Sequence, residues 1–278
     1  MSVAGRFDRM TERRPRAYST RAIVIGQRDY VDSARIISIL SPEFGKREVV
    51  ARGLLKPRSR LAGHHEPGTY CQLEIAVGRN LDVIREAQTI EMFREARSDL
   101  QSLTIFLYAL DLADKFSLED TGEELFNPLL TVIQRIAKGY SHSVSIRSFE
   151  FELLDSSGFR PVLDRCIHCG LDVPAEEAVW SPTNGGVVLK QCLNNVQNIS
   201  SISARALKVL RAYQEWDFDQ LVAITVDSSL ELELSSVMHG LMKTVLEREL
   251  KSANLVEEVR WWQASNCLLY TSPSPRDS

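Results

Sequence analysis

The spacing of apolar residues changes once along this chain, near residue 91, and that change limits the folds open to it. Before it, short apolar runs such as Ala22–Ile25 and Ile36–Leu40 are separated by glycine-bearing turns, which is typical of strands. After it, apolar residues recur every three or four positions, which is typical of helices. The sequence therefore predicts an α+β protein with its strands first and its helices after them.

Five short strands are predicted between residues 18 and 90. They cover residues 21–26, 34–40, 48–51, 69–77 and 81–84. Gly78, Arg79 and Asn80 between the last two strands predict a tight hairpin. Five short antiparallel strands joined by such turns predict a closed barrel of OB type, a fold whose strands and loops often bind oligonucleotides.

Amphipathic helical stripes follow the predicted barrel. They lie at residues 100–114, 125–136, 149–154 and 234–246, and Ser203 predicts the N-cap of a further helix. We interpret the stripes as core faces of a helical domain over residues 91–159 and 201–262. Residues 1–17 are expected to form a flexible basic extension, and residues 263–278, where the helical period has stopped, a disordered or non-native tail.

A cysteine pair marks an irregular insert over residues 160–200. Cys166 and Cys169 have the two-residue spacer of one half of a zinc ribbon, and Cys192 stands where the last ligand of the other half belongs. Leu189 occupies the position of the remaining thiolate and cannot bind metal. The residues therefore favour a metal-free ribbon, and the alternative is a structural zinc held by the three cysteines.

The first quarter of the chain is basic although the whole chain is acidic. Residues 1–63 hold 14 Lys or Arg and 6 Asp or Glu, a balance of +8, whereas the whole chain carries −4, so residues 64–278 carry −12. This asymmetry indicates a face that binds polyanions. On an OB-type barrel the expected partner is nucleic acid, either single- or double-stranded DNA.

The loop between Gly53 and Gly63 carries the densest charge. Its Lys56, Arg58 and Arg60 would share one side of an extended segment at spacings of about 6–7 Å, near the phosphate spacing of a nucleic-acid strand. Tyr30, Phe44 and Tyr70 are candidates for stacking on bases. The predicted DNA-binding residues are Arg21, Arg35, Lys46, Arg47, Arg52, Lys56, Arg58, Ser59 and Arg60.

Several classes of protein find no support in the sequence. It has no phosphate-binding loop for ATP, no serine-hydrolase or metalloprotease motif, no run of about 18 apolar residues, and no apolar segment of a secretory signal. We therefore expect a cytoplasmic protein that is not an enzyme. Two alternatives remain: an interaction scaffold whose basic face docks an acidic protein, and a metal-dependent hydrolase with a dispersed site.

The order of these features resembles the RecO family of bacterial recombination mediators. The resemblance covers roughly residues 18–255 and rests on the motifs at 22–25, 41–46, 53–63, 151–161, 166–170 and 181–186. It implies an OB-fold, a helical domain, and a zinc-ribbon-like insert that some members keep without metal. Leu189 departs from the family pattern.

The resemblance also implies a function in DNA repair. Such proteins anneal complementary strands without ATP and help to load recombinase onto single strands coated with single-stranded-DNA-binding protein (SSB), working with RecR and in many bacteria with RecF. They act in the cytoplasm, at the nucleoid. We further hypothesise that the apolar stripe at 234–250, with Lys243, Arg248 and Lys251 nearby, receives the acidic tail of SSB.

Overall fold

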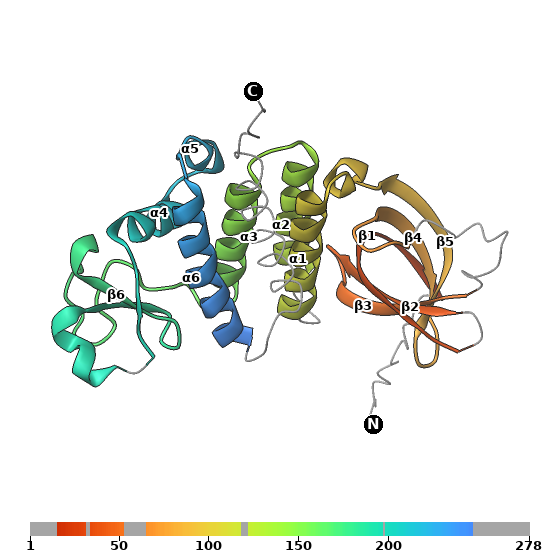
Figure 1. Ribbon diagram of the computed structural model, residues 1–278. Helices are drawn as coiled ribbons and strands as arrows, with labels where there is room; N and C mark the ends of the chain where they lie inside the picture. The colour runs from red at the N-terminus through yellow and green to blue at the C-terminus, as the bar shows by residue number, and fades with distance from the viewer. Residues whose placement is uncertain (1–15, 32–33, 53–64, 118–121, 197, 247–278) are drawn as a thin grey trace, which may run out of the picture.

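The computed structural model describes residues 16–31, 34–52, 65–117, 122–196 and 198–246. Figure 1 shows three neighbouring parts: a strand barrel, a layer of helices beside it, and a small sheet beyond the helices. The strand part precedes the helices in sequence, so the α+β class predicted from the apolar spacing is confirmed. None of the helices within the described residues is long and apolar enough to span a membrane.

The barrel is closed by five strands in the order β1-β2-β3-β5-β4. Their bounds are β1 Ala17–Asp29, β2 Arg35–Ser41, β3 Gly45–Ala51, β4 Tyr70–Ala76 and β5 Asp82–Glu91. Neighbours are antiparallel except β3 and β5, whose parallel pairing of Val49 with Asp82 and of Val50 with Val83 closes the barrel. The predicted five-stranded barrel and the hairpin between its last two strands are both confirmed.

Strands β1 and β5 extend further than the apolar runs predicted. Residues such as Arg28 and Glu86 remain in the backbone ladder although their side chains are exposed. A strand needs only one buried face, so a polar end that leaves the core still pairs through its backbone. The apolar pattern therefore marked the buried part of each strand and missed its ends.

Successive residues of the strands serve two separate cores. Ala22 and Val24 of β1 point into the barrel, where they join a cluster with residues of β2 to β5. The alternate residues Ile23 and Ile25 point out of the barrel and belong to the apolar cluster that includes the helices. The alternation of side chains along a strand thus places one set inside the barrel and the other against the helices.

Six α-helices follow the barrel in the described residues. They are α1 Leu100–Phe116, α2 Gly122–Ala137, α3 His142–Ser156, α4 Ala204–Glu215, α5 Phe218–Val222 and α6 Ser228–Leu246, with 3₁₀ turns η1 Arg94–Arg97, η2 Ala175–Glu177 and η3 Lys190–Asn195. The predicted N-cap is confirmed, because the Ser203 hydroxyl accepts a hydrogen bond from the Ala206 N–H at 3.0 Å. Helix α5 has too few residues to show a period in sequence, and it was not predicted.

A small sheet lies at the far side of the helices from the barrel (Figure 1). It has the strand order β7-β6-β8, with β6 at Ala178–Ser181, β7 at Gly186–Leu189 and β8 at Ser200–Ser201. Trp180 of β6 is fully buried and joins the same apolar cluster as the helices. This sheet and the loop that carries Cys166 and Cys169 form the ribbon.

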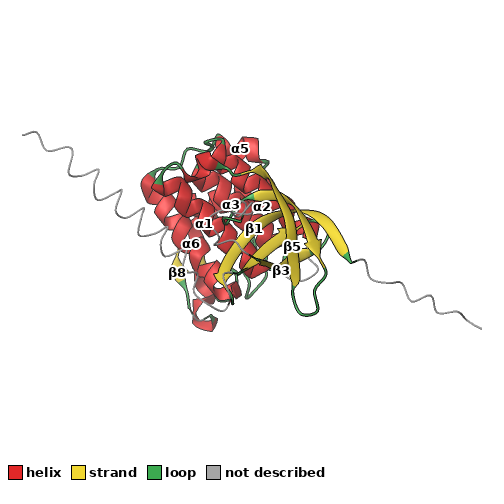
Figure 2. Cartoon of the chain, turned by 90° about the vertical axis from the view of Figure 1, so that its right-hand side faces the viewer, coloured by secondary structure: helices red, strands yellow, loops and turns green. Residues whose placement is uncertain are grey.

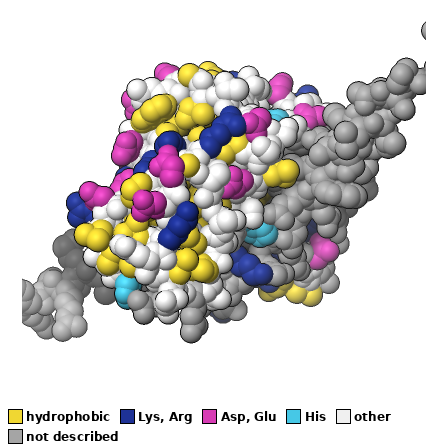
Figure 3. All heavy atoms as spheres, turned by 60° about the vertical axis from the view of Figure 1, so that its left-hand side comes forward, with side chains coloured by type: hydrophobic (Ala, Val, Ile, Leu, Met, Phe, Trp, Pro, Cys, Tyr) yellow, Lys and Arg dark blue, Asp and Glu magenta, His cyan; other side chains and the backbone are white. Residues whose placement is uncertain are grey.

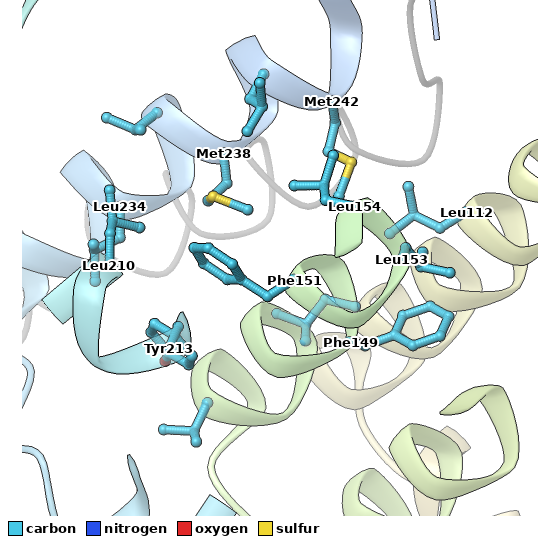
Figure 4. Close-up of a cluster of buried hydrophobic side chains, with 14 of the residues drawn as sticks. Leu112, Phe149, Phe151, Leu153, Leu154, Leu210, Tyr213, Leu234, Met238 and Met242 are labelled. Atoms are coloured by element: carbon cyan, nitrogen blue, oxygen red, sulfur yellow. The ribbon is translucent and has the colours of Figure 1, made fainter. Parts of the chain in front are cut away.

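Helix α6 is packed into the core along its apolar stripe. Figure 4 shows the Phe151 ring of α3 pointing toward Met238 of α6. Tyr213 of α4 lies beside Phe151. The Phe151 and Tyr213 rings stack with their centroids 5.6 Å apart. Leu234, Met238 and Leu241 are almost completely buried. The stripe from Leu234 to Met242 is therefore covered by the protein's own core and is not available to an SSB tail. Val245 and Leu246 are half-buried and line a separate hollow, and residues 247–250 lie outside the described part of the chain, so the hypothesis stays a prediction for the end of the stripe.

Figure 2 looks from the side of the barrel, with the helices behind the strands. Ile23, Leu40 and Tyr70 of the barrel share one apolar cluster with residues of α1 and α2, so barrel and helices are packed together. Gly68, which has φ +82°, lies just before β4, and a Cβ atom there would lie 1.9 Å from the Phe106 ring of α1. A Cβ atom on Gly122, at the start of α2, would lie 2.2 Å from the carbonyl oxygen of Pro42. Glycine at these two positions therefore permits the approach of backbone to helix that the interface requires.

A buried ion pair ties the helices together. Arg147 and Glu150 of α3 have side chains that are 4% and 0% exposed, with the guanidinium Nη1 2.5 Å from the carboxylate Oε2. The Tyr108 hydroxyl of α1 donates a hydrogen bond to the other oxygen of Glu150 at 2.7 Å. Burial, followed by the nearby Glu150 charge, raises the pKa of Tyr108, so its hydroxyl stays protonated as a donor.

Replacement of Arg147 by methionine should destabilise the protein by about 3–5 kcal/mol, because it leaves the Glu150 carboxylate buried without its counter-ion. Urea unfolding followed by circular dichroism measures the loss. The double variant Arg147→Met/Glu150→Gln removes both charges but keeps an acceptor for Tyr108, and it should recover most of the stability. An equal loss in both variants would show that packing, and not the unpaired charge, sets the cost.

Candidate nucleic-acid interface and cysteine cluster

A hollow of about 680 Å³ opens at one end of the barrel. Three segments that are distant in sequence form it: the β1–β2 connection, the end of β3 and the β4–β5 hairpin. The first and third of these correspond to the loops by which OB-folds bind oligonucleotides. The lining residues are Tyr30, Val31, Ala34, Val50, Arg52, Gly78, Arg79, Asn80, Leu81 and Val83.

Local hydrogen bonds hold two of these segments in place. In the β1–β2 connection, the Tyr30 N–H donates to the Ala34 carbonyl at 3.0 Å. In the hairpin, the Gly78 N–H donates to one carboxylate oxygen of Asp82 at 2.9 Å. The Tyr18 hydroxyl donates to the other oxygen of Asp82, also at 2.9 Å. Burial and this hydrogen bond raise the pKa of Tyr18, so the hydroxyl remains a donor at neutral pH.

The hollow combines an apolar floor with a cationic rim. Val50 is buried with Ala34 and Ile36, and Leu81 and Val83 pack on them. At the rim Tyr30 is 49% exposed, and Arg52 and Arg79 are both exposed. Neither arginine forms an ion pair with a described residue, and none of the lining residues is acidic. In such a hollow the aromatic ring can stack on a base and the two guanidinium groups can contact phosphates.

Two of the predicted DNA-binding cations are engaged within the protein. The Lys46 ammonium lies 2.7 Å from the Asp114 carboxylate and donates to the Asp114 carbonyl at 3.0 Å, which ties the barrel to α1. Arg35 pairs with Asp29 at 3.1 Å and donates to the Gln27 side chain at 3.0 Å. The sequence could not show this for Lys46, because its partner lies in a helix of the following domain.

The remaining predicted residues fall into two groups. Arg21 and Arg47 are exposed on the barrel and are not among the residues that line the hollow. Lys56, Arg58, Ser59 and Arg60 lie outside the described residues. Arg52 is therefore the predicted cation that the structure brings to the hollow. Arg79 was missed because it lies outside the basic first quarter, although its place in the predicted hairpin of an OB barrel was a usable signal.

Of the three aromatic candidates for base stacking, Tyr30 is the exposed one. Tyr70 is buried, and its ring centroid lies 5.9 Å from that of Phe126 in α2. Phe44 is half-buried against Tyr18, with ring centroids 4.7 Å apart. Tyr70 therefore belongs to the core between barrel and helices, and Tyr30 alone of these rings lines the hollow.

The face formed by the ribbon and the later helices has a different electrostatic character. Figure 3 shows Lys and Arg side chains interspersed with Asp and Glu on it. Three cations of this part of the chain are paired with acids: Arg205 with Asp227, Lys208 with Glu176, and Arg160 with Asp155. Because cations and acids are mixed on this face, its electrostatic attraction for a polyanion is weaker than that of the rim of the hollow.

The second candidate site is a cluster of three cysteines. The sulfur atoms of Cys166, Cys169 and Cys192 all lie within 4.8 Å of one another, although Cys192 comes from η3 and the other two from the preceding loop. Gly170, with φ +76°, closes the turn after Cys169, and its N–H donates to the Cys166 carbonyl at 2.8 Å. The fold thus brings together the three thiols that the sequence proposed as ligands.

The surroundings of Cys166 suit a thiolate. The Leu189 N–H donates to the Cys166 sulfur at 3.4 Å. Burial raises the pKa of this thiol, but backbone hydrogen bonds from Leu189, Cys169 and His168 outweigh it and lower the pKa to about 7. Burial and the neighbouring cysteines instead raise the pKa of Cys192 to about 11. By contrast, burial raises the pKa of the barrel residue Cys71 to about 12, as expected of an inert thiol.

The donor set fits a soft divalent cation. Two sulfurs bound to tetrahedral zinc lie about 3.8 Å apart, which follows from a Zn–S distance of about 2.3 Å. The three sulfurs of the cluster reach such an arrangement with small side-chain movements, since they already lie within 4.8 Å. The cluster can therefore hold a metal ion.

Comparison with known proteins agrees with these features. The family model described as Recombination protein O N terminal matches residues 16–93, and Recombination protein O C terminal matches residues 97–254. The DNA repair protein RecO of Roseiflexus sp. is 31% identical over 248 residues, which are 89% of this chain and 87% of that protein. The RecO proteins of Desulforamulus reducens and Dehalococcoides mccartyi (strain CBDB1) are also 31% identical, over 87% and 89% of this chain and 94% and 98% of theirs. The chain, with its OB-type barrel, helices and cysteine ribbon, therefore belongs to the RecO family of DNA repair proteins.

Proposed function

We propose that this protein binds single- and double-stranded DNA at the open end of its barrel and anneals complementary strands without ATP. The observation that carries the proposal is the exposed Tyr30 ring, which lines one hollow with Arg52 and Arg79 at the loops that OB-folds use for nucleic acid. Membership of a family of DNA repair proteins supports the same partner.

The proposed mechanism is electrostatic with a contribution from stacking. Arg52 and Arg79 neutralise phosphates and release counter-ions, which favours binding to any sequence. Lys56, Arg58 and Arg60 follow Arg52 in the chain, and we propose that they extend these phosphate contacts. Lower charge on a bound strand reduces its repulsion of a complementary strand, so that base pairing can proceed. A base stacked on Tyr30 would contribute about 1–3 kcal/mol.

We also propose that the annealing activity serves recombinational repair. The family resemblance implies work on single strands coated with SSB, together with RecR and in many bacteria RecF, to load recombinase. Such a protein would act in the cytoplasm, at the nucleoid, where its DNA lies. The protein's own part in this function is the binding and pairing of strands, which requires no catalytic residue.

Reversal of both rim charges, in the variant Arg52→Glu/Arg79→Glu, should weaken binding to a single-stranded oligonucleotide. The slope of log affinity against log salt should also become shallower by about 0.7 for each phosphate that the variant no longer neutralises. Fluorescence anisotropy over a series of salt concentrations measures both quantities.

The matched control is Arg165→Glu, which reverses an exposed arginine on the ribbon, paired at 3.6 Å with exposed Asp172. It should leave affinity and salt slope unchanged. If the two variants weaken binding equally, the interaction is not localised at the barrel hollow.

Replacement of Tyr30 by alanine should cost about 1–3 kcal/mol of single-strand affinity with little change in the salt slope, because it removes stacking but no charge. Tyr30→Phe keeps the ring and should bind like the unaltered protein. Equal losses in both variants would mean that the hydroxyl, and not the ring, binds the strand.

The annealing function itself is tested with two complementary oligonucleotides, one of which carries a fluorophore and the other a quencher. The protein should accelerate quenching in the absence of ATP, on naked strands and on strands coated with SSB. The Arg52→Glu/Arg79→Glu variant should lose the acceleration. DNA binding without any acceleration of annealing would restrict the function to binding.

A further inference from the structure

The turn over residues 166–171, here called the knuckle, is held by hydrogen bonds of its backbone. The Cys166 N–H donates to the Leu171 carbonyl at 2.8 Å, and the Gly170 N–H donates to the Cys166 carbonyl, also at 2.8 Å. The positive φ of Gly170 lets the chain reverse its direction there. The backbone therefore fixes Cys166 and Cys169 relative to each other without help from their sulfur atoms.

Helix α4 anchors both ends of the knuckle. The Arg211 guanidinium donates to the Leu163 carbonyl at 2.8 Å and to the Val173 carbonyl at 2.7 Å. The Val173 N–H in turn donates to the Asp164 carbonyl at 2.8 Å, which closes the base of the turn. Because these bonds already hold the segment, a change at the sulfur atoms does not require it to unfold.

The sulfur atoms lie close enough for a covalent bond to form after small side-chain movements. Those of Cys166, Cys169 and Cys192 lie within 4.8 Å of one another, and a disulfide joins its sulfurs at about 2.05 Å. Cys166 and Cys169 both belong to the knuckle, whereas Cys192 comes from η3. The first two can therefore join without moving one element against another, and their two-residue spacer is that of reversible dithiol motifs.

One thiol of the cluster is open to a reagent in solution. Cys169 is exposed, whereas Cys166 and Cys192 are buried. Cys71 is 0% exposed inside the barrel, in an apolar cluster that contains no second cysteine among the described residues. A reaction with a reagent in solution therefore starts at Cys169, and Cys71 provides an internal reference for a thiol that does not react.

We propose that Cys166 and Cys169 form a thiol–disulfide site that a low-molecular-weight disulfide, of the class of oxidised glutathione, oxidises reversibly. The site lies in the ribbon and is independent of the hollow in the barrel. The disulfide removes two of the three sulfur donors of the cluster, so oxidation and the binding of a metal ion there exclude each other.

The reaction consists of two thiol–disulfide exchanges. The Cys169 sulfur, as the thiolate, attacks one sulfur of the small disulfide, whose S–S bond breaks and releases one small thiol. The Cys166 sulfur then attacks the Cys169 sulfur of this mixed disulfide, forms the bond within the knuckle and releases the second small thiol. Two electrons pass from the protein to the small disulfide, and the two released thiols carry the two protons that the cysteines lose. An excess of small thiol reverses both steps.

Differential alkylation followed by peptide mass spectrometry tests the proposal. The full chain carries Cys267→Ser to prevent cross-links between molecules, and a chelator keeps its thiols free of metal. As the oxidised fraction of a glutathione buffer rises, Cys166 and Cys169 should lose alkylation together, while Cys71 and Cys192 remain alkylated. An excess of reduced glutathione should restore both thiols.

The sequence lets trypsin distinguish the possible disulfides. Cleavage after Arg165 and after Lys190 places Cys166 and Cys169 in one peptide and Cys192 in the next. The proposed bond should therefore appear as a single peptide that is lighter by two hydrogens, whereas a bond to Cys192 would join two peptides.

Matched serine variants separate the roles of the three thiols. Cys192→Ser should oxidise like the parent chain. In Cys169→Ser the thiols that remain in the cluster are buried and should be oxidised at least about tenfold more slowly. The double variant Cys166→Ser/Cys192→Ser should complete only the first exchange and retain glutathione on Cys169. Circular dichroism checks that each variant is folded.

Three results would overturn the proposal. One is that Cys166 and Cys169 of the folded parent chain stay free at every ratio of oxidised to reduced glutathione. Another is a first product that joins two tryptic peptides, which would assign the reaction to Cys192. The third is an unchanged rate of oxidation in Cys169→Ser, which would show that the exposed thiol is not the point of entry.

Discussion

One continuous apolar core connects the barrel, the helices and the ribbon, and the positions of both candidate sites depend on it. Ile23 and Tyr70 enter this core from the outer face of the barrel, Phe149 from the helices, and Trp180 from the ribbon. Each buried side chain of this size contributes about 1.5–3 kcal/mol relative to exposure, so the three parts are held to one another by the same force that folds each of them. The wall of the barrel that faces the helices is therefore unavailable to a ligand, and the loop end remains open.

The buried polar groups act within this core as constraints on its geometry. Arg147 and Glu150 are both withdrawn from water, and the Tyr108 hydroxyl satisfies one carboxylate oxygen from another helix. Such a group tolerates little displacement, because separation would leave a charge in an apolar surrounding. At the barrel, Asp82 plays a comparable part at the surface, since it holds the β4–β5 hairpin by two hydrogen bonds. One side of the hollow is thus a hairpin held by these hydrogen bonds, and another side is the end of β3.

Local patterns predicted much of the fold and part of the sites. The change of period near residue 91 separated strands from helices, the hairpin at Gly78 was found, and Ser203 was recognised as an N-cap, because each of these is decided by residues adjacent in sequence. The interpretation of the helical stripe around Leu234 as a binding surface could not be decided from the pattern. The stripe around Leu234 has the same pattern whether it packs on other helices or receives a partner, and periodicity does not distinguish the two.

Three features can be read from the amino-acid sequence alone: the order of strands and helices, the excess of positive charge near the start, and a cysteine pair with the spacing of a metal knuckle. Which of these groups lie together depends on the folding of the whole chain. Lys46 is held by Asp114, 68 residues away, so its charge is already compensated, whereas Arg52 meets Tyr30 and Arg79 at a common hollow. Cys192 joins Cys166 and Cys169 because the chain between them folds back as a sheet. Contacts between distant residues depend on how the elements pack, and packing is settled by the whole core and not by any local pattern.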